Sequence, residues 1–393
     1  MKRIIITKLD NSIIFALYDD LTMIEVNLED ANCRSVLDNI YIGKVKKVVK
    51  NINAAFIDIG INKDCYYSYE DNSNPIFVKG TKNPRPCVGD EIIVQVSKEA
   101  NKLKAPSLSS SLRFSGNYVL VTTGEEGLGV SRKIGSERKS ELESLISQLQ
   151  LRDTSIIVRT NAAAAANKDI ITELKNINQI ITNDIENWKH RTCFSLLWQS
   201  APAYLTLLKN ISLSAYDEIL TDDEIIFSQL KEFIQKNYPA ELSRLKLYND
   251  TYPLIKLYSM EKNLKEALSK RIWLKSGAFL IIEPTEALTV IDVNSGKNVS
   301  RKNKEENIMS INKEAATEII RQLRLRNLSG IILIDFIDMY KDEYKNELIS
   351  YVKELASSDP TGITVFDITR LGLMELTRKK IRKPLHEQIC NKL

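Results

Sequence analysis

Two aspartates, Asp292 and Asp335, each end a short apolar run of this 393-residue sequence. Residues 288–291 and 331–334 are aliphatic apart from one threonine, which predicts two buried strands of a parallel sheet. Carboxylates that converge repel each other unless a cation lies between them or one is protonated. Oxygen ligands, with no thiol or imidazole nearby, favour Mg²⁺ or Mn²⁺ over zinc. The chemistry predicted here is therefore that of a hard divalent cation.

The segment between the two runs should hold them in register. Apolar residues recur at three- and four-residue steps from about 304 to 327, and Gly330 follows, so a helix is predicted there. Strand, helix and strand make a crossover unit whose strands lie side by side or one strand apart. Both aspartates then reach the carboxyl edge of the sheet, where open α/β sheets keep their sites. The alternative is that each aspartate only caps the turn after its strand.

Length and composition limit the function classes. The chain is too long for one ordinary core, and 43% hydrophobic with 27% charged residues is typical of a soluble globular protein. We find no signal peptide and no apolar run near the ~20 residues that span a membrane, so a cytoplasmic protein is expected. Five scattered cysteines and two histidines argue against a disulfide framework, a closed zinc site and a Ser-His or Cys-His nucleophile.

Upstream segments are rich in β-strand patterns. Residues 1–34 predict a small β-meander that needs a partner from elsewhere in the chain. Residues 35–115 predict short strands broken by glycine, as in a small closed barrel such as an OB-fold. Phe56 and Tyr66, flanked by Lys98 and Lys104, would form a cationic stacking platform for a single strand, unless both rings belong to the core. The net charge of +4 is too small to predict nucleic-acid binding by itself.

Two arginines follow predicted strands. Arg159 and Thr160 lie between a strand at 154–158 and a helical region expected from 162 to about 208, a suitable cradle for a phosphate. Arg370 follows a strand at 362–367, where it could stabilise charge on a scissile phosphate. Further helices are expected near 136–149, 224–236, 261–270 and 342–357.

Residues 286–295, 321–326 and 334–339 closely resemble the catalytic region of bacterial ribonuclease E/G endonucleases, and the likeness covers nearly the whole chain. The resemblance implies an α/β and β multi-subdomain fold. In it, an OB-fold RNA-binding barrel (35–115) is inserted in a ribonuclease-H-like subdomain (1–34 and 212–274). A 5′-end sensor (116–211) and a deoxyribonuclease-I-like nuclease subdomain (275–393) complete it.

The same resemblance implies a bacterial Mg²⁺-dependent endoribonuclease that cuts single-stranded, A/U-rich RNA and leaves 5′-phosphate and 3′-hydroxyl ends. A 5′-monophosphate would stimulate it, and its roles would be ribosomal RNA processing and messenger decay. Asp292 and Asp335 would hold the metal, with Mn²⁺ as an alternative, and Asn294 would orient the first carboxylate or the attacking water. The 5′-phosphate would contact Arg159, Thr160, Gly116 and Leu120, and the base contacts would fall on Phe56, Tyr66, Lys98 and Lys104.

Two departures from the family pattern stand out. Asn161-Ala162 replaces the usual Ala-Gly after the sensor threonine, and Cys390 has no C-x-x-C partner, so zinc and a zinc-bridged dimer are not expected while another homodimer stays open. The rival function is a non-catalytic OB-fold RNA-binding protein. A nuclease that had lost its activity would be free to lose one of the carboxylates, whereas this sequence retains Asp292, Asn294 and Asp335 together. A nucleotide-hydrolase P-loop is excluded, because Ile291 and Asn298 occupy positions that require glycine and serine or threonine.

Overall fold

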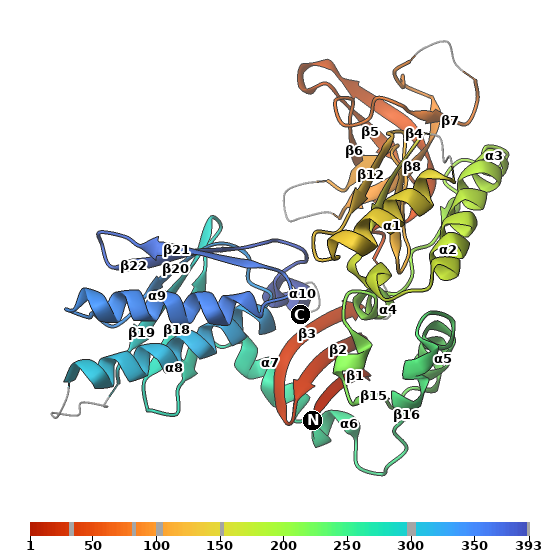
Figure 1. The fold of residues 1–393 in the computed structure, drawn as a ribbon. Helices are drawn as coiled ribbons and strands as arrows, with labels where there is room; N and C mark the ends of the chain where they lie inside the picture. Colours follow the sequence, from red (N-terminus) through yellow and green to blue (C-terminus); the bar gives the residue numbers. More distant parts are fainter. Residues whose placement is uncertain (31–34, 81–83, 100–104, 150–152, 297–303, 391–393) are drawn as a thin grey trace. The chain divides into compact units, whose positions relative to one another are not determined.

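The computed structural model describes residues 1–393 except 31–34, 81–83, 100–104, 150–152, 297–303 and 391–393. The chain forms two compact units, one of residues 1–33 and 210–393 and the other of residues 34–209 (Figure 1). Mixed α/β layers and a closed barrel confirm the general fold class that the sequence predicts. The finer division into five subdomains remains a prediction.

The first unit begins with a five-stranded sheet of order β16-β15-β1-β2-β3. Its antiparallel meander comprises β1 (Lys2–Leu9), β2 (Ser12–Asp19) and β3 (Thr22–Asp30). The partner that the meander required is β15 (Glu218–Thr221), which pairs with β1 in parallel, followed by β16 (Leu245–Leu247). The surrounding helices are η4 (Leu213–Ala215), α5 (Glu224–Asn237), η5 (Pro239–Arg244), α6 (Leu254–Leu257) and α7 (Met260–Leu268).

The second sheet of this unit, here called the nuclease sheet, has the order β17-β18-β19-β20-β22-β21. Its strands are β17 (Arg271–Trp273), β18 (Phe279–Pro284), β19 (Leu288–Asn294), β20 (Gly330–Asp335), β21 (Ile363–Ile368) and β22 (Leu373–Arg378). As expected, β19 and β20 are parallel neighbours joined through α8 (Lys304–Leu325). Helix α9 (Asp342–Ser357) follows β20, and α10 (Leu385–Cys390) ends the described chain.

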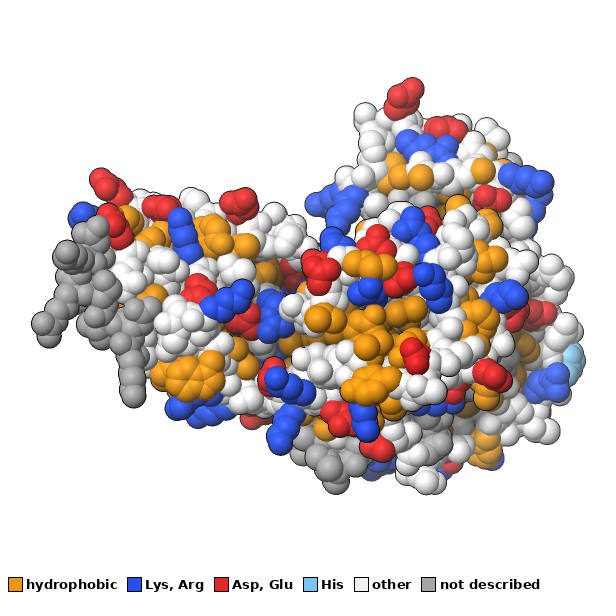
Figure 2. Space-filling model, turned by 90° about the horizontal axis from the view of Figure 1, so that it is seen from below, with side chains coloured by type: hydrophobic (Ala, Val, Ile, Leu, Met, Phe, Trp, Pro, Cys, Tyr) orange, Lys and Arg blue, Asp and Glu red, His pale blue; other side chains and the backbone are white. Residues whose placement is uncertain are grey.

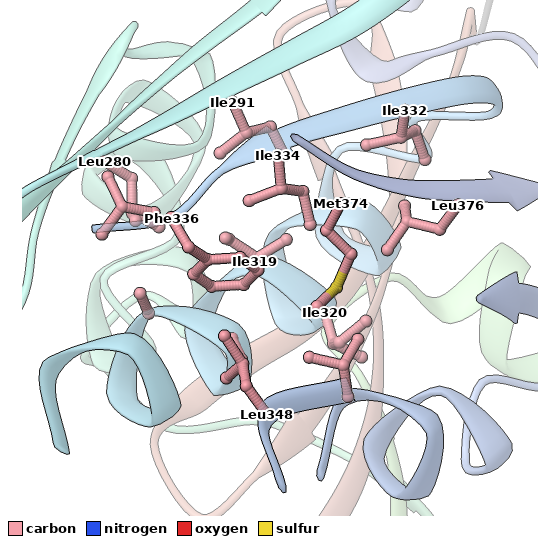
Figure 3. Packing of buried hydrophobic residues seen from close by; sticks show 14 of the residues in the cluster. Leu280, Ile291, Ile319, Ile320, Ile332, Ile334, Phe336, Leu348, Met374 and Leu376 are labelled. Atoms are coloured by element: carbon pink, nitrogen blue, oxygen red, sulfur yellow. The ribbon is translucent and has the colours of Figure 1, made fainter. Parts of the chain in front are cut away.

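Helices α8 and α9 cover one face of the nuclease sheet (Figure 1). Figure 3 shows the packing, in which Ile291 and Ile334 from the strands meet Ile319 and Leu348 from the helices. These four side chains are at most 1% exposed. The opposite face of the sheet is left to the alternate residues of each strand, which include the two aspartates.

The second unit contains a β-barrel closed in the order β4-β5-β6-β9-β8-β4, with β7 and β14 added at its margins. Strands β6 and β9 are parallel and the other barrel neighbours are antiparallel, an arrangement like that of the five-stranded OB-fold. The bounds are β4 (Ile40–Val49), η1 (Lys50–Ile52), β5 (Ala54–Asp58), β6 (Cys65–Ser68), β7 (Ile76–Phe77), β8 (Glu91–Lys98) and β9 (Ser107–Ser109).

A four-stranded sheet of order β10-β11-β13-β12 completes this unit and shares a hydrophobic core with the barrel. It comprises β10 (Arg113–Ser115), β11 (Val119–Thr123), β12 (Gly127–Val130) and β13 (Thr154–Val158). The helices beside it are α1 (Ser136–Ser147), η2 (Thr160–Ala163), α2 (Asn167–Gln179), the π-helical η3 (Ile180–Asp184) and α3 (Ile185–Trp188).

The single long helix expected up to residue 208 is wrong. After α3 the chain turns through Phe194, whose φ is +68°, and Leu196–Trp198 form β14 against β4 before a short α4 (Ala203–Leu208). Backbone hydrogen bonds join Ile42 to Phe194 and to Ser195. Pairing with the barrel edge therefore outweighs local helix propensity here.

Side chains of both charge signs alternate over the face shown in Figure 2, in keeping with the small net charge. Among the described residues, no helix is long and apolar enough to cross a membrane.

Candidate active site and RNA-binding surfaces

The two aspartates lie directly opposite each other. Asp292 on β19 pairs with Asp335 on β20 in the parallel ladder. Their chain neighbours Ile291 and Ile334 are buried on the helix-covered face, and successive side chains alternate between faces, so both carboxylates lie on the open face. The convergence predicted from the strand pattern is present.

The electrostatics of the pair suit a cation. Burial, and then the carboxylates of Asp292 and Asp338, raise the pKa of Asp335. Asn294 donates from Nδ2 to Asp292 Oδ2 at 2.7 Å, which holds the first carboxylate in place. Within the described part of the chain, no three His, Cys, Asp or Glu side chains form a metal-binding group. A cation here would take two protein carboxylates and find its other ligands in water and substrate, as Mg²⁺ commonly does.

The neighbouring loops are fixed by close packing. Gly296 follows Asn294 with φ +59°, and a Cβ at this position would lie 2.3 Å from the carbonyl oxygen of Gly277 in the β17–β18 turn. Glu314 of α8 accepts backbone N–H groups of Lys275 and Ser276 in the same turn, at 2.7 and 3.3 Å. The strand ends that carry the site are thus anchored to the helix beneath them.

Arg370 lies in the turn between β21 and β22, and its side chain is exposed. Leu373, the first residue of β22, pairs with Asp335, so this turn is at the same edge of the sheet as the carboxylates. Thr369 closes the turn, because its Oγ1 accepts the N–H of Leu373 at 3.2 Å. Arg370 is therefore at the expected edge, and its role remains a prediction.

The candidate 5′-phosphate pocket is assembled at the end of β13. Arg159 donates from Nη1 to the Gly116 carbonyl at 2.7 Å, and the Thr160 hydroxyl lies 2.9 Å from that of Ser131. Leu120 lies within β11, opposite Ile157 of β13. The structure brings Arg159 and Gly116 together, while Thr160 is exposed beside them.

The predicted base-stacking residues form a row across the outside of the barrel. Phe56 pairs directly with Tyr66, Tyr66 with Ser107, and Ser107 with Lys98. The two rings are half-buried and meet edge to face with centroids 6.1 Å apart, so they are not core residues. A pocket of about 270 Å³ adjoins the row, lined by Tyr66, Lys98 and several serines. Lys104 lies outside the described residues.

Comparison with known proteins identifies the family. The ribonuclease E/G family model matches residues 113–381. Ribonuclease G of Salmonella typhimurium is 30% identical over 379 residues, which is 93% of this chain and 77% of that protein. Ribonuclease G of Haemophilus influenzae is 31% identical with the same two shares. The chain belongs to the ribonuclease E/G family. Ribonuclease E of Haemophilus influenzae is 30% identical, but only 41% of that longer protein is covered.

Three supporting residues of this family member escaped the sequence analysis. Asn312 of α8 is fully buried, donates to the Ile337 carbonyl at 2.9 Å and accepts the Ile337 N–H at 3.1 Å, which fixes the backbone after Asp335. Lys47 pairs with Phe56 and extends the barrel row by one cation. Of the three residues, only Lys47 carried a signal in the sequence, because it belongs to a basic run at 44–50.

Glu173 of α2 is the third. Its carboxylate accepts the backbone N–H groups of Asn117 at 2.9 Å and of Tyr118 and Val119 at 3.0 Å. The loop that starts at Gly116 is therefore occupied by a protein carboxylate. The backbone donors at 117–119 are therefore committed to Glu173.

Proposed function

We propose that this chain is a metal-dependent endoribonuclease that cuts single-stranded RNA. The observation that carries the proposal is the direct pairing of Asp292 with Asp335 on the open face of the nuclease sheet, at the carboxyl ends of β19 and β20. The chain also belongs to the ribonuclease E/G family. Mg²⁺ is the proposed cofactor, with Mn²⁺ able to replace it, because the donors are carboxylates alone.

Each residue at the carboxylate pair has a separate proposed role. Asp292, oriented by Asn294, and Asp335 would hold the cation. When bound, Mg²⁺ supplies Lewis-acid stabilisation of a phosphate oxygen and eases deprotonation of water. Arg370 at the same edge offers a positive charge to the phosphate as its charge grows. We propose that water attacks the phosphorus and that the bond from phosphorus to the 3′ oxygen breaks, so that one product carries the 5′-phosphate and the other the 3′-hydroxyl.

The second unit supplies the grip on the strand. Phe56 and Tyr66 stack on bases, and Lys98 with Lys47 neutralises backbone phosphates nearby. Arg159 and Thr160 bind a 5′-monophosphate, so RNA with that end is cut faster than RNA with a 5′-hydroxyl. We propose a preference for A/U-rich single strands and roles in ribosomal RNA processing and messenger decay, in line with the family.

The test is internal cleavage of a 3′-labelled A/U-rich RNA with Mg²⁺ or with EDTA. Asp335→Asn should abolish cleavage and keep RNA binding. The matched control is Asp342→Asn in the first turn of α9, where the carboxylate is 88% exposed and forms a weak surface ion pair with the nearby Lys345. It should cleave normally. Tight binding by the wild-type protein without cleavage under any divalent cation would instead establish a non-catalytic RNA-binding protein.

A further inference from the structure

The open face of the nuclease sheet carries an aromatic pair beside the carboxylates, the exposed Trp273 and the half-buried Phe279. Trp273 on the outermost strand β17 pairs with Phe279 on β18, and Phe279 pairs with Asn294 on β19. Paired residues share a face of a sheet, so this row lies on the same face as Asp292 and Asp335. Trp273 is two inter-strand spacings from Asn294, or about 10 Å.

The pair is built as a platform. The ring centroids of Trp273 and Phe279 are 5.2 Å apart with planes inclined by 57°. The guanidinium carbon of Arg271 lies 4.6 Å from the Phe279 centroid and 5.8 Å from that of Trp273. Trp273 remains 64% exposed, so its ring is open to a ligand.

We infer that Trp273 stacks against a nucleobase of the bound RNA close to the cleaved bond, while Arg271 contacts the adjoining phosphate. A single-stranded nucleic acid fits the chemistry, since an aromatic ring with a neighbouring cation is how proteins hold single strands without reading their sequence. The strand register also supports this inference. Arg271 pairs with Ile281, and Ile281 pairs with Asp292, so Arg271 lies in the same row across the sheet as the first carboxylate. This inference rests on the proposed nuclease function and adds a nucleotide subsite to it.

A second copy of the chain is the competing occupant, because β17 is an edge strand with an exposed ring. Charge favours RNA over a second copy, because Arg271 gives the platform a cation and a phosphodiester strand carries the complementary charge. The experiment below separates the two occupants.

The experiment combines the ring with the base that it would hold. RNA binding is measured by fluorescence polarisation in the Asp335→Asn background, so that cleavage does not interfere, with an abasic nucleotide moved stepwise past the cleaved bond. At one position, loss of the base should weaken binding about tenfold. Trp273→Leu should weaken binding of intact RNA by a similar factor, and the abasic nucleotide at that position should then cause no further loss of affinity. Trp273→Phe should keep most of the affinity.

The control is Tyr252→Leu, which removes another exposed ring, 54% accessible, from the loop before α6. It should respond to the abasic series as the parent does. Equal abasic penalties in the parent and in Trp273→Leu would overturn the subsite. A change in sedimentation with Trp273→Leu, without a change in the abasic series, would assign the platform to a second copy. Failure of the wild-type protein to cleave any RNA would instead refute the proposed function.

Discussion

Replacing Glu173 by glutamine should weaken the response to a 5′-monophosphate without slowing cleavage of other RNA. The carboxylate holds the loop at 117–119 through three backbone N–H groups. The carbonyl of Gly116, the preceding residue, accepts Arg159 Nη1. A Cβ at Gly116 would lie 1.9 Å from Glu173 Oε1, so the loop and the carboxylate fit closely. Glu173 therefore orients Arg159 through the loop.

The magnitude follows from counting acceptors. Oε1 takes two of the N–H groups and Oε2 takes one, and hydrogen bonds to a charged group contribute ~1.5–3 kcal/mol against ~1 for neutral pairs. Glutamine keeps one acceptor oxygen, places an N–H₂ against the remaining backbone donors and removes the charge. A local loss of about 3 kcal/mol results. If about half of it is lost from the positioning of Arg159, the preference for the 5′-monophosphate becomes about tenfold smaller.

The assay is kcat/KM for one RNA sequence carrying either a 5′-monophosphate or a 5′-hydroxyl. Glu173→Gln should lower the ratio of the two values about tenfold and leave the hydroxyl value unchanged, with Arg159→Ala as the floor. Asp169→Asn removes an exposed carboxylate from the same helix and should leave the ratio intact. A ratio that rises in Glu173→Gln would show that the carboxylate repels the phosphate, and equal loss on both RNAs would show only structural damage.

Three further outcomes are expected. Phe56→Leu should raise KM about tenfold with kcat unchanged in steady-state cleavage, because stacking in the barrel row is lost; a fall in kcat alone would contradict this. Arg378→Met should lower the free energy of unfolding by about 3–5 kcal/mol in urea titrations, because it leaves the carboxylate of Asp359, 1% exposed, buried without its partner. Burial raises the pKa of the Cys65 thiol to about 12, so iodoacetamide at pH 8 should label exposed Cys87 and spare Cys65 in the native protein, as mass spectrometry would show.

The parts of the fold that the sequence could predict are those set by local pattern. The apolar runs ending at Asp292 and Asp335, joined by a helix with regular apolar spacing, determine a parallel pair and the edge at which it ends. Phe56 and Tyr66 could be placed on neighbouring strands, since each lies in a short run bounded by turn residues. Helix α9 agrees at both ends with its predicted range, 342–357.

The remainder depends on contacts between distant residues. Glu173 lies at least 54 residues from the N–H groups that it binds, and no spacing rule connects them. Asn312 belongs to a helix face that is otherwise apolar, so its hydrogen bonds to Ile337 become visible only once α8 is packed on the sheet. The expected long helix failed for the same reason, because Leu196–Trp198 find strand partners on β4 that local propensity does not register.

The carboxylate pair and the core of the nuclease sheet are consequences of one alternation. Ile291 and Ile334 enter the helix-covered core because Asp292 and Asp335, next in each strand, face the other way. A slip of one residue in either strand would turn its aspartate into the apolar layer and its isoleucine into solvent. Burying an unpaired carboxylate costs several kcal/mol, so the core excludes every register except those that keep both aspartates outside. Burial of the two isoleucines is therefore enough to place the aspartates on the open face. Substitutions that loosen the packing of these apolar residues should disturb the carboxylate geometry before they unfold the sheet.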